Sequence, residues 1–161
     1  MQTPDLFDLL EKLNIEFTRI DHVPVFTSEQ ARELISPALG ASAKNLFLRD
    51  KKGKRHFLIT LKDDKTLDLK KLAKSIGSSR LSFASPERLA KHLQLEPGAV
   101  SPLALVNDKV FQVEFWIDAE LYLEEFIQCH PLVNTSTLIM KTTDLEKFLD
   151  HTGHKINKIP I

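Results

Sequence analysis

Residues 44–61, KNLFLRDKKGKRHFLITL, predict the central feature of the fold. Two apolar runs, 45–49 and 56–61, stand on either side of a short polar segment that contains Gly53. Apolar runs rich in aromatic and branched residues, separated by a short glycine-containing turn, are typical of a β-hairpin. We therefore predict two paired strands here, joined by a basic turn.

Helix signals lie on both sides of this hairpin. Leu6, Leu9, Leu10 and Leu13 recur at i, i+3, i+4 and i+7, which predicts an amphipathic helix starting near Thr3. The other predicted helices begin at capping motifs: TSEQ (27–30) opens one through 35, Asp68 one through 76, SPE (85–87) a third, and TDLE (143–146) one that ends near Gly153.

The remaining apolar segments predict strands at residues 15–20, 110–117 and 138–140. These strands are not spaced for simple βαβ alternation, and no repeat or linker divides the chain. We expect one mixed α+β domain spanning residues 1–161.

Composition excludes several classes of protein. Apolar residues make up 42% and charged residues 27% of the chain, which is normal for a globular protein. No apolar run approaches membrane-spanning length, and the first residues lack a signal-peptide pattern. A single cysteine cannot form an internal disulfide. We expect a cytoplasmic protein with no membrane partner.

The charge balance limits any contact with nucleic acid. The 22 basic side chains are matched by 22 acidic ones, whereas proteins that hold long duplexes are usually basic overall. We therefore expect no DNA partner, and any RNA contact must be local, such as one end of an RNA. The basic segment 49–55 reads most simply as a solvated hairpin tip.

Several common catalytic arrangements are absent from the sequence. There is no HExxH, CxxC or GxSxG motif and no glycine-rich phosphate loop, so we expect no metal and no cofactor. Cys129 and His130 could suggest a thiol nucleophile with its base. Adjacent residues on an extended strand point to opposite faces, however, which argues against that pair.

Two polar stretches are candidates for a site, and each has a plain structural alternative. Lys44 and Asn45 directly precede an apolar strand, where a lysine also serves to discourage edge aggregation. Residues 96–102, EPGAVSP, form a loop in which two prolines flank residues 98–101. Such a loop could direct several backbone N–H groups at one point, as in an oxyanion hole, or could simply be a turn.

A third candidate is the segment 128–137, QCHPLVNTST, which carries an imidazole, an amide and three hydroxyls beside a predicted core strand. Polar clusters of this kind usually satisfy their own backbone. From the residues alone, His130 and Asn134 are compatible with either a site or a well-bonded loop.

The blocks KNLFLRD (44–50), GAVSP (98–102) and HPLVN (130–134) together resemble the prolyl-tRNA editing family. Its free-standing deacylases are similar to the insertion editing domain of bacterial prolyl-tRNA synthetase. The resemblance extends through HVPVFT (22–27) and RLSFASP (80–86) to TGH (152–154), and so covers nearly the whole chain. Cys129 departs from the bulky apolar residue that the resemblance leads us to expect.

The resemblance implies hydrolysis of a wrong amino acid, most simply alanine, from the 3′ end of tRNA(Pro). It also implies a mixed, mostly antiparallel, barrel-like sheet flanked by helices. Lys44 would hold the terminal phosphate or ribose, Gly98 to Pro102 would supply backbone groups around the ester, and His130 would line the pocket. The implied substrate-binding residues are Thr27, Asn45, Ala99, Val100, Ser101 and Asn134, and the implied RNA-binding residues are Arg80 and Lys51.

The chemistry agrees with this implication. An aminoacyl ester is already activated, so oriented water and a stabilised oxyanion suffice without a metal or a strong nucleophile. Two alternatives stay open: a sister deacylase that clears cysteine or another small amino acid, and a non-catalytic module that binds RNA or prolyl-tRNA synthetase.

Overall fold

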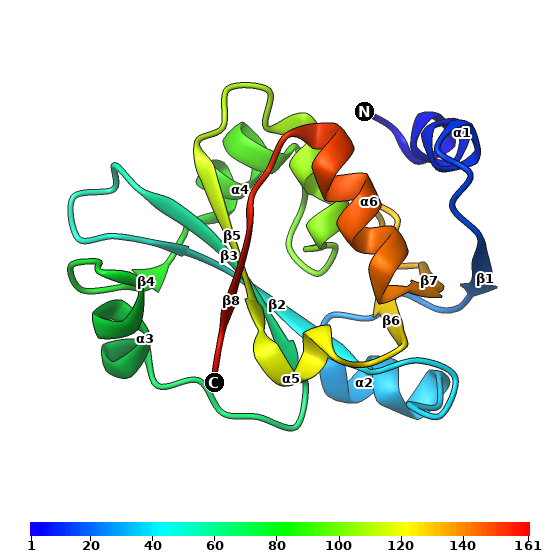
Figure 1. Ribbon diagram of the computed structural model, residues 1–161, viewed down its shortest axis with the longest axis horizontal. Coiled ribbons are helices and arrows are strands. Elements are labelled where there is room, and N and C mark those ends of the chain that lie inside the picture. Colours follow the sequence, from blue (N-terminus) through cyan, green and yellow to red (C-terminus); the bar gives the residue numbers. More distant parts are fainter.

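The computed structural model describes all 161 residues, arranged as helices packed around two β-sheets (Figure 1). The helices are α1 (Thr3–Lys12), α2 (Ser28–Leu34), α3 (Leu69–Ile76), α4 (Pro86–Leu93), α5 (Ala119–Tyr122), α6 (Thr142–Thr152) and the 3₁₀ helix η1 (Pro102–Asn107). The strands are β1 (Phe17–Asp21), β2 (Ala43–Arg49), β3 (His56–Lys62), β4 (Ser82–Phe83), β5 (Val113–Asp118), β6 (Phe126–Cys129), β7 (Ser136–Lys141) and β8 (Ile156–Ile159).

The predicted hairpin forms the centre of the larger sheet. Strands β2 and β3 pair antiparallel, with Asn45 opposite Thr60 and Arg49 opposite His56. This sheet has the order β4-β2-β3-β5-β8, and the pairs β3–β5 and β5–β8 are parallel. In Figure 1 the β2–β3 turn projects to the left, near α3 and β4.

The smaller sheet is antiparallel, in the order β1-β7-β6. It meets the larger sheet at one bridge between Ala41 and Ile127, where the Ala41 N–H donates to Phe126 and the Ala41 carbonyl accepts from Gln128. The expected mixed α+β fold with flanking helices is confirmed. The strands nevertheless form two open sheets rather than a closed barrel, because only this single bridge joins them.

Two apolar clusters lie on opposite faces of the larger sheet. Because side chains alternate along a strand, Phe47 and Leu58 face a cluster of 24 buried residues, whereas Leu48 and Phe57 face one of nine. The larger cluster joins α1, α4, η1 and α6 to the sheet, and α3 covers the smaller one. No helix is both long and apolar enough to cross a bilayer.

Helices and strands follow the predictions closely, with informative exceptions. The capping box predicted at 143–146 is wrong, because α6 begins at Thr142, whose hydroxyl donates to the Glu124 carbonyl at 2.6 Å. Strand β5 begins at Val113 rather than at 110, because the Asp108 carboxylate accepts from the N–H groups of Gln112 and Val113 and closes a turn. Strands β4, β6 and β8, the short helix α5 and the 3₁₀ helix η1 had no predicted counterpart.

Candidate functional site

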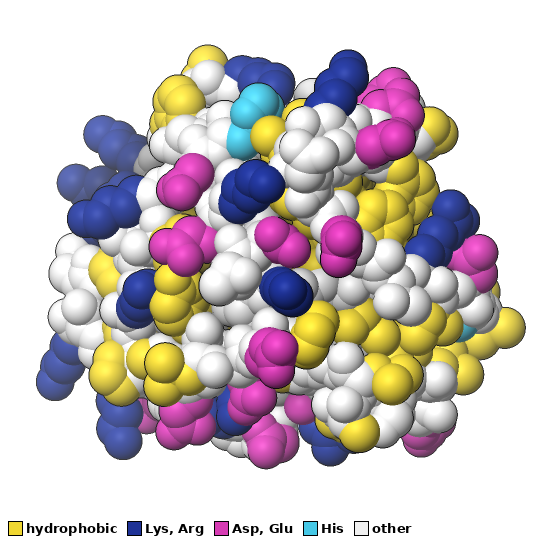
Figure 2. Space-filling model, turned by 45° about the vertical axis from the view of Figure 1, so that its right-hand side comes forward, with side chains coloured by type: hydrophobic (Ala, Val, Ile, Leu, Met, Phe, Trp, Pro, Cys, Tyr) yellow, Lys and Arg dark blue, Asp and Glu magenta, His cyan; other side chains and the backbone are white.

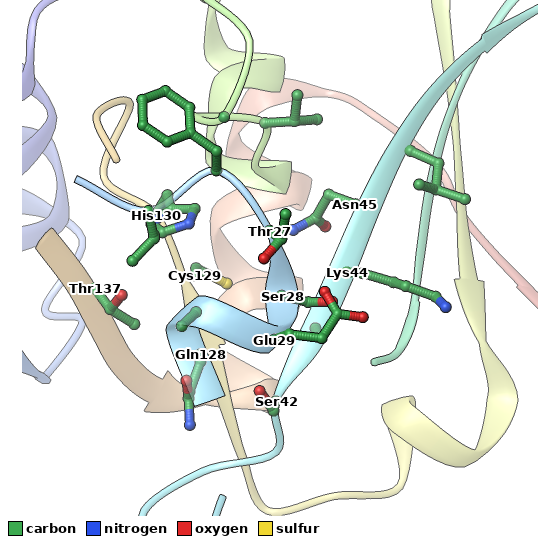
Figure 3. Close-up of a pocket in the computed structure, with 17 residues that line it drawn as sticks. Thr27, Ser28, Glu29, Ser42, Lys44, Asn45, Gln128, Cys129, His130 and Thr137 are labelled. Carbon is green, nitrogen blue, oxygen red and sulfur yellow. The ribbon is translucent and has the colours of Figure 1, made fainter. Parts of the chain in front are cut away.

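A cavity of about 310 Å³ opens where the two sheets meet (Figure 3). Its walls come from four places: the start of α2, the start of β2, the loop at Gly98, and the facing ends of β6 and β7. The lining includes six of the predicted site residues, namely Thr27, Lys44, Asn45, Gly98, Val100 and His130. Segments more than 100 residues apart in sequence therefore converge on one polar hollow.

Strand β2 supplies one wall of the cavity. Asn45 lies on the side of the main core, where its side-chain oxygen accepts a 2.7 Å hydrogen bond from the Thr60 hydroxyl. That bond fixes the orientation of the amide. Its oxygen already accepts from Thr60, so the NH₂ group remains free to donate to a ligand. Lys44, on the opposite face of the strand, extends away from His130 in Figure 3.

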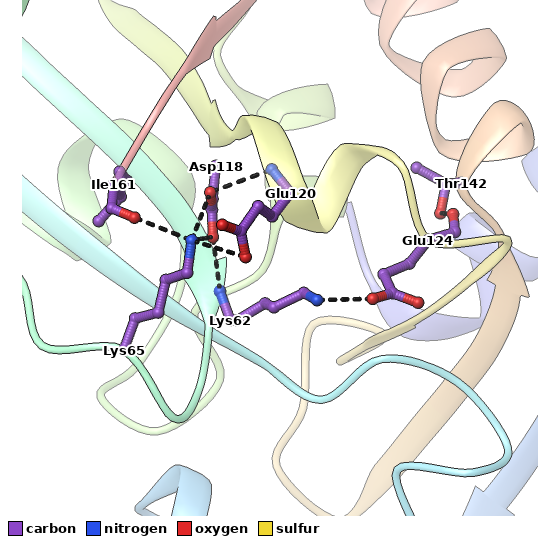
Figure 4. A network of polar contacts seen from close by, with 7 residues as sticks. All are labelled: Lys62, Lys65, Asp118, Glu120, Glu124, Thr142 and Ile161. Carbon is purple, nitrogen blue, oxygen red and sulfur yellow. Dashed lines mark hydrogen bonds and ion pairs between the residues drawn. The ribbon is translucent and has the colours of Figure 1, made fainter.

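The Lys44 ammonium donates to the backbone carbonyl of Lys65, and the Lys65 side chain is itself anchored (Figure 4). The Lys65 ammonium lies 2.9 Å from the fully buried Asp118 carboxylate and 3.2 Å from Glu120, and it donates to the main-chain oxygen of Ile161 at 2.8 Å. Partial burial opposes the charged form of Lys65, but the hydrogen bonds to Asp118 and Glu120 outweigh it and raise the Lys65 pKa.

Gly98 packs closely against Asn134 and the segment that precedes α2. Its φ is +92°, in the region that L side chains rarely adopt. A Cβ at this position would lie 3.2 Å from the Phe26 ring and 3.3 Å from both the Asn134 amide nitrogen and the Val25 carbonyl. Glycine is therefore required by backbone conformation and by space.

Asn134 contacts this loop from behind and does not line the cavity. Its side chain donates to the Val25 carbonyl at 2.9 Å, and its own carbonyl accepts from the Val25 N–H at 3.0 Å. Asn134 thus clamps the chain just before Thr27 and supports Gly98. This geometry makes it a positioning residue for the wall.

The rest of the Gly98 loop turns inward. Ala99, Ser101 and Pro102 are buried, and the Ser101 hydroxyl accepts from the Leu103 N–H at the start of η1. The N–H groups of Gly98 and Val100 donate to no acceptor within the protein, although both residues line the cavity. Of the loop residues that line the cavity, these two therefore have backbone donors available to a ligand.

His130 lies across the cavity from Lys44 (Figure 3). Its Nδ1 is 3.0 Å from the Ser136 carbonyl, and a carbonyl can only accept, so Nδ1 carries the proton and Nε2 is left with a lone pair. Burial lowers the His130 pKa; the nearby His22 also lowers it, and the bond to Ser136 partly offsets both effects. The imidazole is therefore neutral at pH 7 and can accept a proton.

Cys129, next to His130, is 2% exposed, and burial raises its pKa to about 12. The thiolate is the reactive form of cysteine, so this side chain is an inert, protonated thiol near neutral pH. No group of three or more His, Cys, Asp or Glu side chains is placed to share a metal ion.

Arg80 and Lys51 lie together at the other end of β2, away from the cavity. The Lys51 N–H donates to the hydroxyl of Ser79, the residue before Arg80, and both basic side chains are exposed. Lys44 and Lys51 are seven positions apart along a mostly extended chain, a span of roughly 20 Å. Any contact that they make with a ligand is remote from the cavity.

Sequence reasoning missed several residues that line the cavity: Val25, Phe26, Ser28, Glu29, Ala31, Ser42, Ala43, Leu46, Gln128 and Thr137. Five of these ten residues come from α2 and from two positions shortly before it, a segment that meets β2 only in the folded chain. Thr137 had one usable signal, since it belongs to the polar cluster around His130. Its hydroxyl lies 2.9 Å from Nε2 of His22, which links that histidine to the cavity wall.

Known proteins with similar sequences are named for editing or deacylating aminoacyl-tRNA. The model of the aminoacyl-tRNA editing domain matches residues 22–148. The prolyl-tRNA editing protein ProX of Acetoanaerobium sticklandii is 40% identical over 152 residues, which cover 94% of this chain and 93% of that protein. The multifunctional Ser/Thr-tRNA deacylase ProXp-y of Escherichia coli is 33% identical over 101 residues, which cover 62% of this chain and 60% of that protein.

The fold has solved counterparts as well. One crystal structure is described as that of a proposed trans-editing enzyme for prolyl-tRNA synthetase. It superposes on this protein with a TM-score of 0.72 and is 17% identical in sequence. The match covers all of this chain and 98% of that one. Identity this low supports the fold alone. The match over residues 22–148, together with the 40% identity to ProX, shows that this chain belongs to the aminoacyl-tRNA editing domain family.

Proposed function

We propose that this protein is a deacylase that hydrolyses the ester of mischarged tRNA(Pro), with Ala-tRNA(Pro) as its main substrate. The observation that carries the proposal is the neutral His130, whose Nε2 lone pair is available at a cavity that also holds two free backbone N–H groups. Membership of the editing family supports the reaction class, and the name of the relative ProX supports prolyl-tRNA.

In the proposed mechanism, water attacks the ester carbonyl carbon while His130 Nε2 accepts one of its protons. The carbonyl oxygen becomes an oxyanion that the N–H groups of Gly98 and Val100 stabilise. The intermediate collapses by breaking the bond to the ribose oxygen, which takes the proton from His130. The products are free alanine and a tRNA with an intact terminal hydroxyl.

Strand β2 forms the wall opposite His130: Asn45 offers a free NH₂ donor on one face of the strand, and Lys44 extends from the other face, away from His130. We assign Asn45 to the substrate near the ester and Lys44 to the terminal phosphate or ribose at the rim. Because small misplacements of reacting atoms are costly in rate, these contacts serve to position the ester.

The preference for alanine follows from sieving by size. A synthetase pocket that admits proline cannot strongly exclude a smaller side chain, since a missing methylene is worth only about 1–3 kcal/mol. A second site that admits only small residues removes this error. Prolyl-tRNA synthetase is then the natural partner, and the cytoplasm the natural location.

A second candidate is a deacylase with a different small amino acid as substrate. The relative ProXp-y is named for action on Ser- and Thr-tRNA, and hydroxyl groups of Thr27 and Thr137 at the cavity wall are compatible with a polar substrate. A non-catalytic binding module is disfavoured, because such a module needs no neutral base beside unpaired backbone donors.

The deciding experiment measures single-turnover deacylation of Ala-, Cys-, Ser-, Thr- and Pro-tRNA(Pro) by the purified protein. We expect Ala-tRNA(Pro) to be fastest and Pro-tRNA(Pro) to be spared. Ala-tRNA(Ala) is the matched control for recognition of the tRNA. Faster clearance of Ser or Thr would favour the second candidate, and rates equal to those without protein would exclude a deacylase.

A further inference from the structure

A second cavity of about 400 Å³ lies at the other end of the hairpin, between the β2–β3 turn, the last turn of α4 and the start of β5. It shares no residue with the first. Its lining is Gly53, Lys54, Arg55, His56, Arg88, Lys91, His92, Phe111, Gln112 and Glu114. Figure 2 shows Lys and Arg side chains gathered on the left of the molecule, the side on which the β2–β3 turn lies in Figure 1.

The charges around this cavity are unbalanced. Glu114 is the one carboxylate in the lining, and both of its oxygens accept from Arg55, at 2.9 and 3.0 Å. Lys54, Arg88 and Lys91 form no ion pair. Three cations therefore border one hollow without an anionic partner in the protein.

Arg88 is held in place by neutral acceptors. Its Nη1 donates to the Gly53 carbonyl and lies 3.0 Å from Nε2 of His56. A Cβ at Gly53 would stand 2.7 Å from Nη2 of Arg88, so glycine lets the turn close against the guanidinium. The arginine is thus pre-organised while its charge stays uncompensated, which lowers the entropic cost of binding an anion.

His56 helps to hold Arg88 at the same site. Arginine can only donate, so His56 Nε2 accepts from Arg88 and Nδ1 carries the proton. That Nδ1 is buried and has no hydrogen-bond partner, an arrangement that is costly without a ligand or solvent. Burial, the His92 ring 4.0 Å away, Arg88 and Lys91 together lower the His56 pKa to about 4, although Asp50 acts in the opposite direction.

We propose that this second cavity binds a phosphate group. Its planar guanidinium and two lysine ammonium groups match the charge and the acceptor oxygens of phosphate. His56 lies on the same face of the sheet as Thr60, the hydrogen-bond partner of Asn45. His56 and Thr60 are four positions apart, so the two sites are roughly 13 Å apart along the strand. That distance suits one ligand that spans both sites.

The first experiment needs no aminoacyl substrate and so does not depend on the proposed function. Inorganic phosphate is titrated at constant ionic strength against chloride, with the melting temperature and the ring resonances of His56 and His92 as readouts. We expect a saturable response. Lys91→Ala and Arg88→Gln should each weaken binding about tenfold, because hydrogen bonds to charged groups are strong. Lys91 is exposed, so its variant keeps the fold.

Lys12→Ala and Lys147→Ala are the matched controls, since both remove an exposed cation outside the second cavity. They should leave phosphate binding unchanged. An equal response to chloride overturns the proposal. So does unchanged phosphate binding in both Lys91→Ala and Arg88→Gln.

A second experiment identifies the source of the phosphate by comparing Ala-tRNA(Pro) with alanyl-adenosine, which has no phosphate. If the group belongs to the RNA backbone, Lys91→Ala lowers kcat/KM about tenfold on the tRNA and leaves the nucleoside rate unchanged. If it is a free phosphate compound, both rates stay unchanged while inorganic phosphate binding is lost. A fall on both substrates with phosphate binding intact overturns the proposal. If the wild-type protein hydrolyses neither substrate, the proposed deacylase function is wrong, whereas the proposed phosphate site is unaffected.

Discussion

The Lys44 ammonium donates a hydrogen bond to the main-chain carbonyl of Lys65, whose own ammonium is fixed by the buried Asp118. A lysine at the rim of the cavity is therefore held by a carbonyl, not neutralised by a carboxylate. Its full charge remains available to a ligand, and its position depends on a loop that is tied to Ile161 at the end of the chain.

Lys44→Ala should abolish most turnover while the protein stays folded. If Lys44 positions the 3′ end, the loss should be roughly a hundredfold in the single-turnover rate on Ala-tRNA(Pro). Lys44→Arg should not fully restore the rate, because a planar fork differs in shape from a compact ammonium. Lys12→Ala removes an exposed lysine on α1 and serves as the control. A folded Lys44→Ala variant with a near-normal rate would refute the assignment.

Lys65→Met should slow the reaction about tenfold, because the loop that holds the Lys44 ammonium would shift and displace it. The Lys65 carbonyl is retained, but its loop loses the ion pair with Asp118. Stability should also fall by about 1–3 kcal/mol, because a buried carboxylate loses its charged partner. The control is Lys62→Met, which removes a neighbouring and more exposed pair with Glu124. Kinetics measured well below the melting temperature separate the two effects, and an unchanged kcat would mean that Lys65 is only structural.

Gly98→Ala should lose both stability and activity. The positive φ costs roughly 1–3 kcal/mol for a residue with a Cβ, and the added carbon would press on Phe26 and Asn134. Gly77→Ala is a close control, because Gly77 has a φ of +67° but nothing within 4 Å of its would-be Cβ. We expect both variants to melt earlier in thermal denaturation and only Gly98→Ala to slow deacylation. Equal rates in the two variants would contradict the role of the Gly98 loop.

The enzymatic rate should fall at acid pH with a midpoint below 6.5, the ordinary pKa of histidine. Burial lowers the His130 pKa, so its neutral, proton-accepting form persists as pH falls and is lost only below the usual range. Above this midpoint the rate should be flat once the uncatalysed hydrolysis is subtracted. His130→Gln should cost about 10²- to 10⁴-fold and remove the inflection. Persistence of the inflection in that variant would assign it to another group.

Arg80→Ala should weaken action on tRNA but not on a minimal aminoacyl nucleoside. Arg80 is exposed at the far end of β2 beside Lys51, too remote to touch an ester in the cavity. A guanidinium there can contact a phosphate or a guanine edge. The measurement is kcat/KM on both substrates, with Lys147→Ala as the control. An equal loss on the nucleoside would place Arg80 in the catalytic machinery or in the fold.

Local sequence signals located the elements that depend on neighbouring residues. The hairpin at 44–61, the Thr27 cap of α2 and the Asp68 cap of α3 formed as predicted, because alternation and capping act within a few residues. The 143–146 capping box failed because a tertiary bond from Thr142 to Glu124 shifted the start of α6. Tertiary contacts override such local preferences.

The sequence by itself therefore determined the hairpin, the capped helices and, through motif resemblance, most of the reactive residues. Only the tertiary structure decided how these meet. It brought Val25 against Asn134, and Lys44 against a loop held by Asp118. It also set Arg88 against Gly53 and His56 to form the second cavity. Such contacts join residues tens of positions apart, and the packing and hydrogen bonding that create them leave no periodic trace in the sequence.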